Sequence, residues 1–210
     1  MRAIYLFSTS KHPNARNINS LEITFLQPSI NFRDYDYLIL TSKQAIKALK
    51  FYDIKEYIHK KALCISNATA QSYTQLGADV LDIAKGYGDT LTSFIQEYPK
   101  ETKWLYLRAE TIASDFASLS KKNGYQIDEK IVYKSECSTD IHKSAPKNNA
   151  ILIFTSPSSV ECFLHTHTLN KSYSIIVIGK TTAKKLPPNT DFSISQEKTI
   201  ENCMQMALLL

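Results

Sequence analysis

The chain has 210 residues, of which 43% are hydrophobic and 21% are charged; this is ordinary globular composition, and the length suits one large domain or two small ones. No apolar stretch is long enough to span a bilayer and no secretory signal segment is evident, so we expect a cytoplasmic protein without a membrane anchor. The net charge of +5 favours an anionic partner, but the scattered lysines do not form the pattern of a nucleic-acid-binding surface.

Short apolar strands alternate with helical stretches along almost the whole chain. The first strand is expected at 3–9, and the first helix at 43–60, where apolar residues recur at helical spacing. The other strands are expected at 22–32 with a break at Pro28, 35–42, 62–66, 78–84, 104–110, 125–136, 150–156, 174–179 and 190–195. The other helices are expected at 67–77, 91–98, 113–124, 156–169, 180–186 and 198–210.

The alternation of strands and helices predicts parallel sheets with helical crossovers, an α/β fold. The strands are nearly continuous apolar runs, as sheets covered on both faces require. Gly77 and Gly124 stand in the position of a helix-ending glycine, and the polar residues 137–149 read as a linker or exposed loop.

Four cysteines are present, and none of them forms a C-x-x-C pair. Cys64 and Cys162 lie in apolar runs, where a free thiol behaves as a small hydrophobic side chain. The remaining two are Cys137 and Cys203. We therefore expect no disulfide framework, which favours a reducing compartment.

One sequence motif occurs twice in the chain, as LILTSKQAIKAL at 38–49 and as LIFTSPSSVECFL at 152–164. Each copy is a strand, a Thr-Ser pair and a helix. Two further landmarks follow in the same order: Thr69 matches Thr182 after the next strand, and Thr90 matches Thr199 where a later helix is expected to begin. Three matched landmarks predict two similar α/β modules.

The two modules need not be continuous in sequence. The second module lacks an opening strand, which residues 3–9 could supply. We therefore expect one domain formed by 1–25 together with 142–210 and another formed by 35–130, with interdomain connections at 26–34 and 131–141. Two connections would permit hinge motion but limit how far the domains separate.

Candidate ligand-binding residues lie where the expected parallel strands end, which is where α/β proteins bind ligands. They are Thr41, Ser42, Ser66, Thr69, Arg108, Thr155, Ser156, Gly179 and Thr182. Helix-start N–H groups attract anions, and hydroxyls add neutral donors, so two such surfaces facing each other would form an anion-binding cleft. For any single hydroxyl, a helix cap without a ligand is the stronger interpretation; the repetition favours function.

Searches for other catalytic motifs are negative. There is no phosphate-binding loop, no dinucleotide fingerprint and no nucleophile elbow. Ser156 and Ser158 have no evident His and Asp partners, and His165 and His167 are too close in sequence to face one metal from a helix, so no metal site is expected. Tyr133 lies at the expected interdomain connection, where its hydroxyl could donate a proton, although a packed aromatic is the stronger interpretation of its position alone.

Several of these motifs resemble those of the uroporphyrinogen-III synthase family, from about residue 35 to the C-terminus. They are SNATA (66–70), WLYLR (104–108), NGYQIDEKIVY (123–133), IFTSPSSV (153–160) and VIGKTTA (177–183), and residues 3–9 fit the first strand of the family. The chain departs from the pattern at Ser66, where the family usually has glycine, and at Lys43, the counterpart of Pro157.

The resemblance implies two similar parallel-sheet α/β domains joined by a two-stranded linker, with the N-terminal segment completing the C-terminal domain. It also implies a lyase in tetrapyrrole biosynthesis that cyclises hydroxymethylbilane to uroporphyrinogen III, with loss of water and inversion of the last ring through a spiro intermediate. No metal or organic cofactor takes part. The substrate comes from a preceding hydroxymethylbilane synthase, so transient contact with that enzyme is one expectation, and a monomer is the simplest state.

By the same resemblance Tyr133 would assist departure of the substrate hydroxyl, and Ser42, Thr69, Ser156, Ser158 and Thr182 would hold carboxylates or orient the rings. Thr41, Arg108 and Gly179 would line the same site. The main alternative is a two-lobed receptor that binds an anionic small molecule without catalysis, and a regulatory or scaffolding α/β protein is a third possibility.

Overall fold

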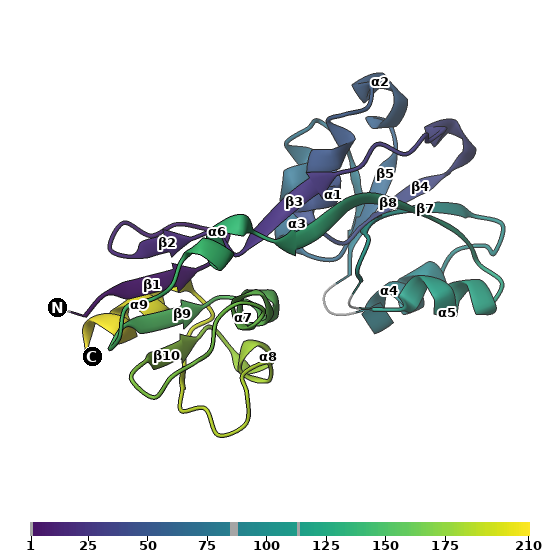
Figure 1. The fold of residues 1–210 in the computed structure, drawn as a ribbon. Helices are drawn as coiled ribbons and strands as arrows, with labels where there is room; N and C mark the ends of the chain where they lie inside the picture. Colours follow the sequence, from purple (N-terminus) through teal and green to yellow (C-terminus); the bar gives the residue numbers. More distant parts are fainter. Residues whose placement is uncertain (1, 85–87, 113) are drawn as a thin grey trace. The chain divides into compact units, whose positions relative to one another are not determined.

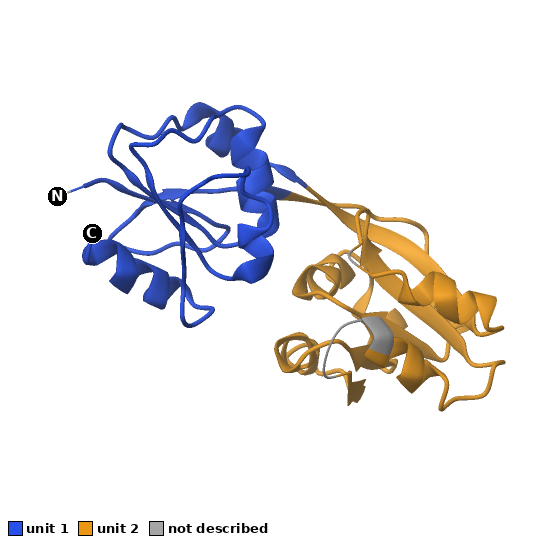
Figure 2. Ribbon diagram, turned by 90° about the horizontal axis from the view of Figure 1, so that it is seen from below, with its two compact units in different colours: residues 1–22, 136–210 blue, residues 23–135 orange. Residues whose placement is uncertain are grey.

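The computed structural model describes residues 2–84, 88–112 and 114–210. The chain divides into two compact units, shown in blue and orange in Figure 2: unit 1 consists of residues 1–22 and 136–210, and unit 2 of residues 23–135. The chain passes between the units twice, within strand β3 (Leu21–Phe25) and near the end of strand β8 (Gln126–Cys137). No described helix has the length and apolar character that crossing a membrane requires.

Unit 1 contains a five-stranded sheet in the order β11-β10-β9-β1-β2, with parallel pairing throughout. Figure 1 labels β10, β9, β1 and β2 of this sheet. Its strands are β1 (Ile4–Phe7), β2 (Arg16–Ile18), β9 (Ile151–Phe154), β10 (Ser174–Val177) and β11 (Ser193–Ile194), and its helices are α6 (Thr139–Lys143), α7 (Pro157–Leu164), α8 (Lys180–Ala183) and α9 (Ile200–Leu208). The N-terminal strand β1 lies between β9 and β2. This confirms that the N-terminal segment completes the sheet of the C-terminal part.

Unit 2 contains a six-stranded sheet in the order β3-β8-β7-β4-β5-β6. Besides β3 and β8, its elements are the short 3-10 helix η1 (Phe32–Asp34), β4 (Tyr37–Leu40), α1 (Lys43–Leu49), α2 (Ile54–Tyr57), β5 (Lys61–Cys64), α3 (Asn67–Thr74), β6 (Val80–Ile83), α4 (Gly88–Ile95), β7 (Lys103–Ala109) and α5 (Phe116–Lys122). The strands from β4 to β8 pair in parallel. The predicted α/β class with two similar parallel sheets is therefore confirmed.

Each sheet buries side chains on both of its faces. In β4, Leu38 and Leu40 pack in one hydrophobic cluster, whereas Ile39 between them packs in another. In β9, Phe154 and Ile153 divide in the same way between two clusters of unit 1. Successive residues of a strand point to opposite faces, so a strand covered on both sides must be apolar at every position.

The helix predicted at 43–60 is wrong as a single element, because α1 ends at Leu49 and α2 begins only at Ile54. Asp53 stops the first helix from continuing: its Oδ1 accepts a hydrogen bond from the N–H of Lys55 at 3.0 Å and so caps α2. Tyr52, in the connection, donates its hydroxyl to the carbonyl of Pro28 at 2.8 Å. The local hydrogen bond of Asp53 competes with a continuous helix, and the spacing of apolar residues does not indicate it. The bond of Tyr52 ties the connection to a distant segment.

The two helix-ending glycines are confirmed. Gly77 and Gly124 have φ angles of 89° and 87°, in the left-handed region that a side chain disfavours. Gly77 lies shortly after α3 and Gly124 shortly after α5. The expected start of that second helix, at residue 113, lies outside the described residues.

Two other local predictions are wrong. The stretch 137–149 is not entirely loop, because Ser138 caps the short helix α6, whose Ile141 is buried. Thr90 does not begin a helix, since it is the third residue of α4, whereas its sequence counterpart Thr199 is the N-cap of α9. The third pair of matched threonines therefore occurs in the same order in both modules, but only Thr199 caps a helix.

The expectation of four unpaired cysteines is also wrong. Cys137, the last residue of β8, forms a disulfide with Cys162 in α7. The two residues are 25 positions apart, and only the packing of α7 beside the end of β8 brings their Cα atoms to 5.3 Å. Cys64 and Cys203 are buried free thiols. Burial raises the pKa of Cys64 to about 12 and also raises that of Cys203, so both are unreactive packing residues.

The disulfide predicts a redox-dependent stability of unit 1. Closing a loop of this length restricts the unfolded chain by about 3 kcal/mol, so the double substitution Cys137→Ser with Cys162→Ser should lower the free energy of unfolding by about that amount. Urea unfolding with and without a dithiol reductant measures the effect, and the double variant should no longer respond to the reductant. A wild-type midpoint that does not move on reduction would contradict the prediction.

Candidate active site

The parallel sheet of unit 2 brings three strand ends together at one edge. Thr41 and Ser42 follow β4, Ser66 follows β5, and Arg108 lies near the end of β7. Ser42 caps α1 by accepting a hydrogen bond from the N–H of Gln44 at 3.1 Å. Short polar side chains at these positions satisfy helix-start N–H groups that would otherwise lack partners.

A cavity of about 330 Å³ opens at this edge of unit 2. Three predicted site residues, Thr41, Ser42 and Tyr133, line it, and the aromatic side chains of Tyr106 and Phe116 form part of its wall. The cavity therefore combines hydroxyl groups with an apolar surface. That combination suits a ligand with a flat ring and polar substituents.

Two pairs of hydroxyl groups stand side by side in this cavity. The hydroxyls of Thr41 and Tyr106 are 3.1 Å apart, and Ser42 lies close enough to the phenol of Tyr133 for its hydroxyl to lower the pKa of that phenol. Burial raises the pKa of both tyrosines, while the hydrogen bonds from Thr41 and Ser42 act in the opposite direction to a smaller extent. Both phenols therefore stay protonated and can donate hydrogen bonds.

A β-bulge gives Tyr133 its place in the cavity. The pairing of β7 with β8 joins Arg108 to Ile131 and then shifts, so that Ala109 pairs with Tyr133 and skips Val132. Val132 and Tyr133 consequently pack in the same hydrophobic cluster, which consecutive residues of a regular strand do not do. Without the bulge the phenol would lie on the other face of the sheet.

Arg108 is not itself among the described residues that line the cavity, and its guanidinium is engaged by neighbouring groups. Its Nε lies 2.8 Å from Oε2 of Glu129, and its Nη1 donates to the carbonyls of Ala109 and Glu110 at 2.8 and 3.0 Å. Lys121 pairs with the other oxygen of Glu129 at 2.8 Å. The guanidinium thus fixes the end of β7, and its predicted contact with a substrate carboxylate stays a prediction.

The two matched threonines are buried. Thr69 is 3% exposed and its hydroxyl lies 3.0 Å from that of Ser66, the N-cap of α3. Thr182 is 1% exposed within α8. The side chain of Thr69 thus contacts the N-cap of its own helix, and direct contact with a ligand stays a prediction for both threonines.

The corresponding edge of unit 1 carries the remaining predicted residues. Ser156 caps α7 in a reciprocal arrangement with Ser159, whose N–H it accepts at 3.1 Å. Ser158 is half-buried in the first turn of the same helix, and Gly179 is the buried N-cap of α8. The helix starts of α7 and α8 thus follow adjacent strands, as the repeat predicts.

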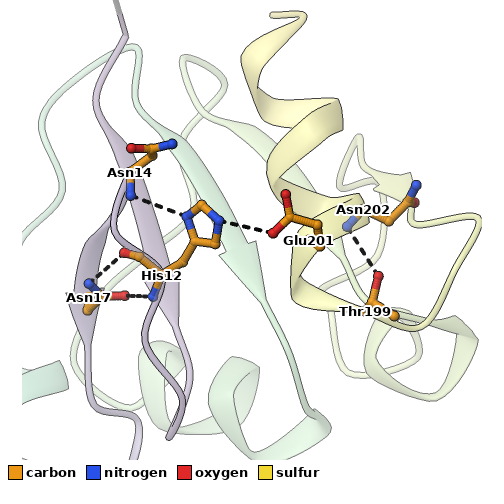
Figure 3. A network of polar contacts seen from close by, with 6 residues as sticks. All are labelled: His12, Asn14, Asn17, Thr199, Glu201 and Asn202. Atoms are coloured by element: carbon orange, nitrogen blue, oxygen red, sulfur yellow. Dashed lines mark hydrogen bonds and ion pairs between the residues drawn. The ribbon is translucent and has the colours of Figure 1, made fainter.

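The connection after β1 is tied to the start of α9 by a polar network (Figure 3). The Nε2 of His12 lies 3.2 Å from a carboxylate oxygen of Glu201, and its Nδ1 accepts the N–H of Asn14 at 3.2 Å. Asn17 binds the backbone of His12 on both sides, with distances of 2.8 and 2.9 Å. Accepting at Nδ1 places the proton of the neutral ring on Nε2, where it is donated to Glu201.

Sequence reasoning missed Tyr106 and His12. Tyr106 lies in an uninterrupted apolar strand, and only the structure shows that its hydroxyl reaches Thr41. His12 lies in a polar stretch without a recognisable motif. In the described part of the chain, no group of three or more His, Cys, Asp or Glu side chains is placed to hold a metal ion.

Comparison with known proteins agrees with this architecture. The sequence model of the family described as "Uroporphyrinogen-III synthase HemD" matches residues 10–205. Among solved structures, the chain resembles uroporphyrinogen-III synthetase from Helicobacter pylori, with a TM-score of 0.83 and 24% identity over 100% of this chain and 99% of that one.

A mutant uroporphyrinogen III synthase from the extremely thermophilic bacterium Thermus thermophilus gives a TM-score of 0.62 and 12% identity, over 100% of this chain and 99% of that one. At these identities the two structures show the fold alone. Comparison with curated protein sequences gives no significant match. The family match covers nearly the whole chain, and on that basis the chain belongs to the uroporphyrinogen-III synthase family.

Proposed function

We propose that the chain converts hydroxymethylbilane to uroporphyrinogen III, with loss of water and inversion of the terminal ring through a spiro intermediate. Family membership supports an enzyme of tetrapyrrole biosynthesis, and the proposed reaction makes it a lyase. The observation that carries the proposal is the cavity of unit 2, where the Tyr133–Ser42 and Tyr106–Thr41 hydroxyl pairs meet an apolar wall.

The size of the cavity fits one reacting ring. Its volume of about 330 Å³ lies at the lower end of the range of roughly 300–1,000 Å³ seen in ligand pockets. A pyrrole ring with its acetate and propionate arms fits such a space, while the other rings of a linear tetrapyrrole extend out of it. We propose that the terminal ring, which carries the departing hydroxyl, occupies this cavity.

Tyr133 is proposed to donate a hydrogen bond to the departing hydroxyl. Its raised pKa makes the phenol a weak acid at neutral pH, which supports the role of hydrogen-bond donor more than that of a full proton donor. If the proton does transfer as water leaves, the proton released when the macrocycle closes restores the phenol. Ser42 orients the phenol through their shared hydrogen bond.

The reaction asks for positioning more than for a strong nucleophile. Ring closure without an enzyme gives the other isomer, so the protein must hold the terminal ring in the geometry that favours the spiro route. A buried cavity with fixed hydroxyls supplies such positioning. The polyanionic substrate also agrees with the net charge of +5.

The other predicted residues enter the proposal with narrower roles. We propose that Ser156, Ser158 and Gly179 bind substrate carboxylates through hydroxyls and helix-start N–H groups. Thr69 and Thr182, whose side chains are buried, are proposed to hold helix starts in place. Arg108 is proposed to contribute its positive charge from the end of β7.

We further propose a monomer that receives its substrate in transient contact with the preceding hydroxymethylbilane synthase. Both sheets are covered on both faces within one chain, which supports a monomer. Spontaneous closure to the other isomer favours a short transfer between the two enzymes. A cytoplasmic location is part of the proposal, although the disulfide removes cysteine usage as an argument for it.

The substitution Tyr133→Phe should lower the rate of type III formation by about a hundredfold, because it removes one donor to the leaving group. A coupled assay from porphobilinogen, with the preceding synthase present and the two isomers separated, measures this. Tyr73→Phe is the matched control, since Tyr73 is also buried and loses a hydrogen bond to the carbonyl of Lys60, yet lies outside the cavity lining. Wild-type protein without type III product would end the proposal, and undiminished turnover in Tyr133→Phe would remove this tyrosine from it.

The substitution Ser42→Ala should lower both stability and turnover. Loss of the α1 cap costs about 1 kcal/mol, and loss of the hydrogen bond to Tyr133 leaves the phenol without its partner. Ser66→Ala removes the cap of α3 and the contact of Ser66 with Thr69, but neither residue is among the described lining of the cavity, so it should lower the melting temperature to a similar extent but retain turnover. Equal loss of turnover in the two variants would show that Ser42 acts through folding alone.

The pKa of Tyr133 predicts the pH response. Burial raises it, so the phenol remains protonated through neutral and mildly alkaline pH, and the type III fraction should not change over that range. Titration of tyrosinate absorbance in the wild type and in Tyr133→Phe measures the ionisation directly. A tyrosine that ionises near neutral pH in the wild type and is missing from the variant would contradict the assignment.

A further inference from the structure

A hollow of about 670 Å³ lies on unit 1 at the sheet edge opposite to Ser156 and Gly179. Ile4 at the start of β1 and Ile151 at the start of β9 form its floor, and the last residues of α9 form one wall. A neighbouring hollow of about 570 Å³ shares Arg2, Arg16 and Leu208 with it. The two hollows together form a basin far in the fold from the strand ends that carry the predicted site residues of this unit.

Three basic side chains, Arg2, Arg16 and Lys147, line the 670 Å³ hollow, and none of its described lining residues is Asp or Glu. Arg2 is occupied by the protein itself: its Nε donates to the carbonyl of Asn149 at 2.7 Å and its Nη2 to that of Ala150 at 3.3 Å. These bonds fix the rim of the hollow. They also keep the positive charge of Arg2 beside the hollow, whose described lining contains no Asp or Glu side chain.

Arg16 is held in place but keeps donors for a ligand. Its Nη1 donates to the hydroxyl of Tyr5 at 3.1 Å, and its guanidinium carbon lies 5.5 Å from the centre of that ring. Its other N–H groups make no hydrogen bond within the described residues, and neither does the ammonium group of Lys147. A guanidinium fixed over an aromatic ring is preorganised for carboxylate or phosphate.

The opposite wall of the hollow is apolar. Leu208 and Leu210 are 55% and 60% exposed, and together with Ala207 and Ile4 they face the same space as the basic groups. Exposed leucines next to basic side chains favour a ligand that has both an apolar part and an anionic group. A fully hydrated inorganic anion would interact with the basic side chains alone and would not contact the leucines.

We propose that this hollow binds a small amphiphilic anion, a molecule with one carboxylate or phosphate group and an apolar body. Arg16 and Lys147 hold the anionic group, Arg2 adds long-range attraction, and Leu208 and Leu210 cover the apolar body. The volume of the hollow is ample for a chain of several carbon atoms with its head group. This binding is independent of the chemistry proposed at Tyr133, which lies in unit 2.

Calorimetric titration of the full chain with octanoate and with octyl phosphate tests the proposal, and the two probes distinguish the carboxylate from the phosphate head group. Acetate and inorganic phosphate serve as controls that have the head group alone, and octanol as a control that has the apolar chain without the anionic group. We expect at least one amphiphile to bind more tightly than either of its halves. No binding of either amphiphile, or equal binding of the isolated head group, would overturn the proposal.

The double variant Arg16→Gln with Lys147→Gln should weaken binding by about tenfold or more, as expected for loss of charged hydrogen bonds. Lys171→Gln with Lys184→Gln removes the same charge from exposed positions outside the hollow and should leave binding unchanged. Leu208→Asn provides a second variant that keeps the cations and should also weaken binding of the amphiphile. Equal affinity in the two double variants would overturn the proposal, whereas binding that persists in Tyr133→Phe separates this site from the proposed catalysis.

Discussion

Parallel strand pairing is the constraint on which both units depend. A parallel strand can be joined to its neighbour only by a connection that crosses a face of the sheet, so each crossover helix starts at the edge where its strand ends. In unit 2 this edge holds the cavity of Tyr133, and in unit 1 it holds the caps Ser156 and Gly179. The other edge contains strand starts and turns, and in unit 1 it forms the basic hollow around Arg16.

Hydroxyl groups at the strand ends serve two purposes, and local geometry decides between them. Ser42 caps α1 and also contacts the phenol of Tyr133, whereas Ser66 caps α3 and contacts only its neighbour Thr69 among the hydroxyls. The difference follows from the register shift between β7 and β8, since Tyr133 then lines the same cavity as Ser42. The same strand-end serine thus lines a cavity in the case of Ser42 and serves only the start of its own helix in the case of Ser66.

Much of the architecture could be predicted because it follows from local and periodic signals. Apolar runs predict the strands, and the repeated motif predicts two similar sheets. Gly77 and Gly124 indicate helix ends because glycine readily adopts the left-handed backbone conformation found there. Some wrong predictions are local: Asp53 and Ser138 cap short helices that apolar spacing does not indicate. The other errors concern contacts between distant residues. Pairing of Cys137 with Cys162 depends on how α7 packs, and the reach of Tyr106 to Thr41 depends on strand order. Neither distance is encoded in the spacing of residues along the chain.

The disulfide between Cys137 and Cys162 closes a covalent ring that contains α6 and β9, the central strand of the sheet in unit 1. The exposed turn at 147–149 also lies inside this ring. A protease that cuts there would open the ring without releasing a fragment, since the sulfur bridge still joins the two pieces. Unit 1 therefore carries a covalent safeguard against backbone cleavage that lasts only as long as its surroundings remain oxidising enough to preserve the bridge.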